Sequence, residues 1–166
     1  MREKLDRLVV RVTDGLALLG AVGVVAMLVH ITAYVILRNL AAAPVPATVE
    51  IVSYYYMVAI AFLPVAWAER RGDMISVEIF AHLLTGRVGR INDAFVGILT
   101  GGVYLMLTYT TWIVAMREFS ARSFVISLNV AIPVWPSFFI LPVAFALAAL
   151  VSIYRGFAPR KLGAAR

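Results

Sequence analysis

Few residues in this sequence could do chemistry. The chain has no cysteine and only two histidines, His30 and His82. It contains no HExxH, GxSxG or GxxxxGK motif, no cluster of metal-ligand residues and no pair of carboxylates within a long apolar stretch. We therefore predict a protein that is not an enzyme and has no metal or other cofactor of its own.

His30 is the one ionisable side chain inside a long apolar stretch. An ionisable residue at such a position is a functional hypothesis by default. The alternative is a neutral imidazole that forms a hydrogen bond across helices or to a backbone carbonyl. We favour this structural interpretation, because no acidic residue lies inside another apolar stretch to relay protons.

The composition indicates the elements that must position these residues. Of the 166 residues, 63% are apolar and 14% are charged, which is far from the composition of a soluble domain. About 20 apolar residues cross a bilayer, and only helices satisfy their own backbone there. We therefore predict an all-α integral membrane protein, with one membrane domain over residues 1–166. Its four transmembrane helices are expected at about 15–37, 51–68, 94–116 and 134–154.

Prolines and loops refine this prediction. Pro64 and Pro142 should each kink the helix that contains them. Residues 123–133 should form an interfacial segment or a loop. The spacing of apolar residues predicts an amphipathic helix on the membrane surface over about 75–92, between the second and third spans.

Basic residues predict the orientation. Twelve of the fifteen lie in the two terminal tails and the loop between the second and third spans. The positive-inside rule therefore places both termini in the cytoplasm. The net charge of +6 then reflects membrane orientation, and we expect lipids rather than nucleic acid as the partner of the basic residues. We interpret the first span as an uncleaved signal anchor.

Several residues could join helices or subunits. Arg38 could pair with Glu50 across the first outer loop, although two solvated charges are an equal alternative. Glu118 and Arg122 are four residues apart, which would suit a helical pair. Gly97 and Gly101 would allow a second helix to approach closely, either within this chain or from another protein.

The order of short motifs along the chain resembles the small membrane subunit of tripartite ATP-independent periplasmic (TRAP) transporters, the DctQ-like family. The motifs include Tyr56-Met57 and Arg71-Gly72, and later Ile132-Pro133-Val134-Trp135. The family's His-Ile-x-Val-Asp stretch reads Met74-Ile75-Ser76-Val77-Glu78 here, so its histidine is a methionine and its aspartate a glutamate. Asp73 and Glu78 would place acidic groups at the start of the surface helix, beside its positive dipole end.

The resemblance implies a transporter of three parts in the bacterial inner membrane. A periplasmic binding protein would capture an organic acid such as a dicarboxylate. A large membrane subunit would carry the acid inward with sodium ions, and this chain would brace that subunit's fixed scaffold. We expect the partner-binding surface on the face of Gly97 and Gly101 and on the alanine-rich last span, which includes Ala144, Ala148 and Ala149. A second surface, for the binding protein, would lie in the outer loops and comprise Arg38, Glu50, Glu118 and Arg122.

Two other functions fit the same composition. One is a small exporter that acts alone as a homodimer, a class that normally depends on a carboxylate embedded in the membrane. The other is a membrane anchor of a redox enzyme, for which a single intramembrane histidine supplies at most one haem ligand.

Overall fold

The computed structural model describes residues 2–41, 46–71 and 86–157. It is mostly helical, and four of its helical segments are long and apolar enough to cross a membrane: Val9–Leu40, Thr48–Arg71, Ile91–Ala121 and Trp135–Phe157. Each overlaps one of the four predicted spans, and the prediction of four transmembrane helices is confirmed at this level. Residues 72–85, with Asp73, Glu78 and most of the predicted surface helix, lie outside the described residues.

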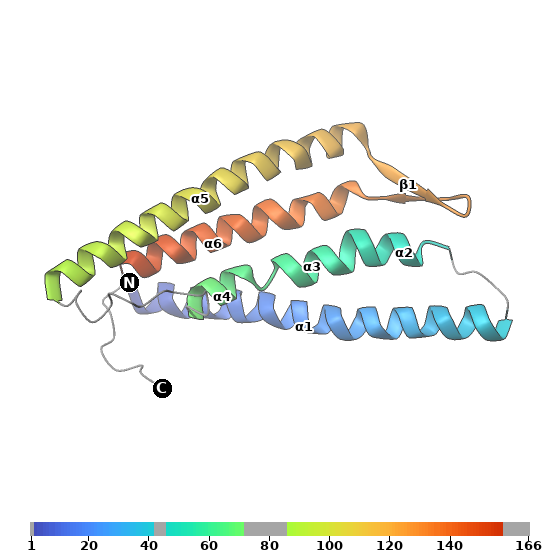
Figure 1. The fold of residues 1–166 in the computed structure, drawn as a ribbon, viewed down its shortest axis with the longest axis horizontal. Coiled ribbons are helices and arrows are strands. Elements are labelled where there is room, and N and C mark those ends of the chain that lie inside the picture. Colours follow the sequence, from blue (N-terminus) through green and yellow to red (C-terminus); the bar gives the residue numbers. More distant parts are fainter. Residues whose placement is uncertain (1, 42–45, 72–85, 158–166) are drawn as a thin grey trace.

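The helices lie side by side in one row (Figure 1). At one edge is α1 (Arg2–Ala41), which packs on α3 (Met57–Phe62) and α4 (Val65–Arg71). These two helices pack on α6 (Ile140–Phe157), and α6 packs on α5 (Gly86–Ala121) at the other edge. We call the end where α1 begins and α6 ends the terminal end of the row. The opposite end is the hairpin end.

The second span is built from short segments. It begins with α2 (Thr48–Ile51) and a π-helical turn, η1 (Val52–Tyr56), and then continues as α3 and α4. The break between α3 and α4 falls at Leu63 and Pro64, as the proline predicted. A side-chain carbon built on Gly20 would lie 3.0 Å from the Pro64 ring, so the glycine lets α1 lie close to this break.

The kink predicted at Pro142 is not required by the position of this proline in the structure. Pro142 is only the third residue of α6, so its missing N–H falls in the first turn, where few α-helical hydrogen bonds have yet formed. The irregular part of the fourth span is instead the 3-10 helix η3 (Trp135–Phe139), directly before α6. The third span also starts earlier than predicted, because residues 86–92 belong to α5 and not to a separate surface helix.

Residues 123–133, predicted as an interfacial segment or loop, form a β-hairpin. Strand β1 (Phe124–Ser127) pairs antiparallel with β2 (Val130–Pro133), and the two turn residues Leu128 and Asn129 have φ angles of 45° and 70°. Positive φ at both positions is typical of the type I′ turn that suits tight hairpins. The backbone N–H of Ala47 donates to Ser127 Oγ at 3.2 Å, and the Tyr55 hydroxyl donates to the carbonyl of Pro133. These contacts tie the hairpin to the start of the second span.

The closest helix contact in the row is between α5 and α6. A side-chain carbon built on Gly97 would lie 2.6 Å from the Cα atom of Gly156, and one built on Gly101 would lie 2.4 Å from the Ile153 side chain. Ser152 Oγ donates to the carbonyl of Gly97 at 3.4 Å. The two helices can pack at this distance because the glycines carry no side chain.

This contact corrects the expected position of the partner-binding surface. Gly97 and Gly101 are buried, and Ala144, Ala148 and Ala149 of α6 are completely inaccessible to solvent. These small residues are covered by neighbouring helices of the same chain, so they are not available to another protein. Their role is to hold the row together.

Replacing Gly97 by leucine should destabilise the protein by at least about 1–3 kcal/mol, because the new side chain would overlap the backbone of Gly156. The matched control is Gly102→Leu on the same helix, since nothing lies within 4 Å of a side-chain carbon built on Gly102. Thermal unfolding in detergent should show a lower Tm for Gly97→Leu and a nearly unchanged Tm for Gly102→Leu. Equal stability of the two variants would contradict the α5–α6 packing described above.

Candidate functional site

The most buried acidic side chain that the structure describes is Glu69, near the end of α4. It is 8% exposed and lies at the terminal end of the row. Its Oε1 atom is 3.7 Å from Nη1 of Arg155 on α6, and its Oε2 atom accepts a hydrogen bond of 3.4 Å from the hydroxyl of Tyr104 on α5. The Arg155 guanidinium also donates to the backbone carbonyl of Glu69. One carboxylate therefore joins α4, α5 and α6.

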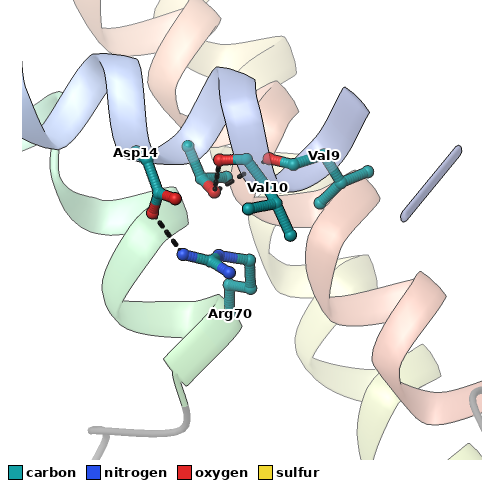
Figure 2. Close-up of polar contacts among 5 residues, drawn as sticks. Val9, Val10, Asp14 and Arg70 are labelled. Carbon is teal, nitrogen blue, oxygen red and sulfur yellow. Dashed lines mark hydrogen bonds and ion pairs between the residues drawn. The ribbon is translucent and has the colours of Figure 1, made fainter. Parts of the chain in front are cut away.

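A second polar contact joins α1 to α4 at the same end. Arg70 donates to the Asp14 carboxylate and forms an ion pair with it (Figure 2). The Thr13 hydroxyl, on the residue directly before Asp14, donates to the carbonyls of Val9 and Val10, one turn earlier in the same helix. The Asp14 side chain is half exposed, so this pair contributes only ~0–1 kcal/mol to stability.

These groups contact one another across the helix interfaces. Among the described residues, no three His, Cys, Asp or Glu side chains lie close enough to hold a metal ion. Glu69 has its oxygens directed at Tyr104 and Arg155, and the Asp14 carboxylate is paired with Arg70. A charge-assisted contact between helices can stabilise their packing where the membrane provides no hydrophobic driving force between them.

Sequence reasoning missed Glu69 and Arg155 as a pair. A usable signal was present, because both residues lie at the ends of spans that were predicted to finish on the same side of the membrane. What the sequence does not contain is the order of the helices in the row. The pair forms only because α6 lies next to α4.

The structure places His30 of α1 beside the second span. Its ring lies 5.8 Å from the ring of Tyr56, centre to centre, with the ring planes at 84°. Tyr56 is the last residue of the π-helical turn η1. This edge-on contact fits a histidine that packs between helices, and the structural role of His30 stays a prediction.

Among the described residues, the charges considered as possible pairs at the hairpin end form no salt bridges with each other. Arg38 donates to the Tyr34 hydroxyl at 3.1 Å and lies over the same ring, while Glu50 occupies the first turn of α2 without a salt bridge to Arg38. Glu118 and Arg122 also form no salt bridge in the part of the chain described. Arg122 has a φ angle of 45° and lies beyond the last residue of α5, so the helical spacing that the pair requires is lost.

Aromatic rings pack beneath the hairpin. Phe119 of α5 lies 5.1 Å from Trp135, and Trp112 lies 5.9 Å from Phe139, both in edge-on contacts between ring centres. Trp and Tyr side chains commonly lie at the membrane–water boundary. The cluster joins η3 to the last turns of α5 at the hairpin end of the row.

Comparison of the sequence with models of protein families identifies the family of this chain. Residues 27–159 match the family described as tripartite ATP-independent periplasmic transporters, DctQ component. The chain belongs to this DctQ family. The matched residues include the second, third and fourth membrane helices and the part of α1 from Met27 onward. Neither the curated proteins nor the solved structures contain a significant match.

Membership of the DctQ family makes this chain a component of a membrane transporter with several parts, and the family is not one of enzymes. The matched range contains Glu69, Tyr104 and Arg155, whereas Asp14 lies before it. The three-helix contact around Glu69 is thus part of the DctQ domain itself. The ion pair between Asp14 and Arg70 adds the first half of α1 to that domain.

Replacing Glu69 by glutamine should destabilise the protein by about 1–3 kcal/mol, because it removes the charged acceptor of Arg155 and Tyr104 from a buried position. The loss of stability in the double variant Glu69→Gln, Arg155→Met should be smaller than the sum of the losses in the two single variants. Such non-additivity is the signature of a direct interaction. Thermal unfolding of the four proteins measures this coupling.

Asp14→Asn is the control for that experiment, since it removes the half-exposed charge of the second pair and should change stability by less than about 1 kcal/mol. Strictly additive losses for Glu69 and Arg155 would contradict the role given to their contact.

Proposed function

We propose that this chain is the small, non-transporting subunit that braces the fixed scaffold of a TRAP transporter. In this proposal the complex takes up organic acids such as dicarboxylates with sodium ions, and a periplasmic binding protein delivers the substrate. The observation that carries the proposal is the single row of helices. A row has two broad faces and little interior, and Thr13 is the largest side chain that is fully buried in the described part.

A transport path through this chain alone finds no support in the polar groups of its membrane helices. The hydroxyls of Thr108, Thr110 and Thr111 donate to carbonyls of their own helix, so they do not line a path for a solute. The described ion pairs lie at the terminal end of the row. A carboxylate substrate would need polar groups near the middle of the bilayer, where transporters of this general type bind their substrates.

A row of helices of this kind is suited to supporting the fixed part of a larger membrane subunit. A large subunit that moves a domain across the bilayer needs other parts that stay fixed, and a sheet of helices attached to those parts enlarges their contact with lipid. The glycine contact between α5 and α6 and the carboxylate contact of Glu69 would keep the row rigid under that load.

The same proposal assigns an orientation. The terminal end would lie in the cytoplasm and the hairpin end in the periplasm, as the distribution of basic residues predicts. Arg38, Glu50, Glu118 and Arg122 would then face the space in which the binding protein works.

The natural absence of cysteine makes the orientation measurable. In intact cells with a permeabilised outer membrane, a membrane-impermeant thiol reagent should label Asn129→Cys in the hairpin turn and leave Phe157→Cys at the end of α6 unlabelled. Lysis should make both positions reactive. Labelling of Phe157→Cys alone before lysis would reverse the proposed orientation.

The proposed role requires three results in vesicles. The large subunit, the binding protein and this chain together should take up an organic acid when a sodium gradient is applied, and omission of this chain should reduce uptake at least about tenfold, a loss of about 1.4 kcal/mol by the usual conversion. This chain alone should transport nothing. Full uptake without this chain would refute the proposal, and solute movement by this chain alone would favour an independent exporter.

A further inference from the structure

The outward face of α5 has no neighbour in the row. Helix α5 is at the edge and packs on α6 and η3, which leaves its opposite side open (Figure 1). Helix α1 is the corresponding edge on the other side. A chain that joins a larger complex must use one of these edges or a broad face of the row, and the two edges differ in composition.

From Val9 onward, the exposed large apolar side chains on α1 are all valine, leucine or isoleucine. The exposed set on α5 also contains aromatic residues and methionines: Phe95, Met106, Tyr109, Trp112, Met116 and Phe119. Aromatic residues and methionine are enriched at protein–protein interfaces. Aromatic residues near the helix ends are explained by the membrane–water boundary, but Met106 and Tyr109 lie near the middle of the span.

Tyr109 has a polar group that lipid cannot satisfy. Its side chain is 68% exposed, and its hydroxyl has no hydrogen-bond partner among the described residues. The apolar part of α5 runs from Ile91 to Ala121, so Tyr109 lies only about 5 Å beyond its midpoint at 1.5 Å per residue. Side chains on a helix lean toward its N-terminus, which directs the hydroxyl back toward the middle of the bilayer. Hydrocarbon has no acceptor for it there.

Gly102 lies on the same face, two turns before Tyr109. In the described part of the chain, nothing lies within 4 Å of a side-chain carbon built at this glycine, in contrast to Gly97 and Gly101. Gly102, Met106 and Tyr109 follow the spacing i, i+4 and i+7, which aligns them along one side of the helix. We call this surface the Tyr109 face. It offers a shallow site for another helix, a flexible methionine and a hydroxyl that needs an acceptor.

We propose that the Tyr109 face binds a transmembrane helix of the large transporter subunit, and that a backbone carbonyl or polar side chain of this helix accepts the Tyr109 hydroxyl. The inference rests on the proposed function for the identity of the partner. The partner helix continues the row beyond α5. The aliphatic edge at α1 faces lipid.

The test measures association of purified large subunit with variants of this chain in lipid nanodiscs. Tyr109→Phe removes only the hydroxyl and should weaken association roughly three- to twentyfold, the range expected for one hydrogen bond between membrane helices. Gly102→Leu fills the site and should weaken it at least as much. The matched control is Gly15→Leu on α1, an exposed glycine that also has nothing within 4 Å, and it should bind like the wild type.

Thermal unfolding of each isolated variant separates binding from folding, and both leucine variants should keep the wild-type Tm. If the wild-type chain does not bind the large subunit, the proposed function fails.

If the wild type binds the large subunit and Tyr109→Phe and Gly102→Leu bind it as tightly as the wild type, the Tyr109 face is not the site and the proposed function stands. Loss of binding in Gly15→Leu alone would move the interface to α1. Loss of self-association in the Tyr109 face variants, with binding to the large subunit intact, would identify a second copy of this chain as the occupant and overturn the inference.

Discussion

The approach of α5 to α6 is the contact on which the rest of the row depends. Gly97 on one helix faces Gly156 on the other, so that the backbones themselves touch. This proximity brings Tyr104 and Arg155 to the same carboxylate, that of Glu69, and so fixes α4 beside α6. Helix α1 packs on the second span through three separate local contacts, at Gly20, His30 and Asp14. The closest packing in the row is made by small residues, and polar contacts at the helix ends hold α4 beside α6 and α1 beside α4.

Lipid explains why the polar contacts are where they are. In hydrocarbon a polar group must find a partner within the protein, and the hydroxyls of Thr108, Thr110 and Thr111 use carbonyls of their own helix. The described ion pairs gather at one end, close to water. This low polarity at mid-membrane agrees with the proposed role, in which the chain supports a partner and does not carry the solute. In the further inference above, the exposed hydroxyl of Tyr109 marks the side of the row that binds the partner.

The sequence predicted four membrane-spanning helices, because long uncharged intervals are nearly sufficient to identify such helices. It also predicted the break at Pro64, which follows from the missing N–H. It selected Gly97 and Gly101 correctly as a close-contact face but assigned that face to a partner, since spacing does not reveal which helix fills it. The contact of Glu69 with Arg155 depends on the order of the helices. The hairpin depends on positive φ angles at Leu128 and Asn129, and leucine gives no signal for such a turn.

The central claim is that this row belongs to the fixed part of a moving transporter. The most direct measurement is the distance between a spin label in the hairpin turn, at Asn129→Cys, and a second label on the large subunit, taken in the inward-facing and outward-facing states. With the second label on the fixed scaffold, the account predicts the same distance in both states. With the second label on the moving domain, it predicts a distance that changes. A row that keeps its distance to the moving domain and changes its distance to the scaffold would contradict the account.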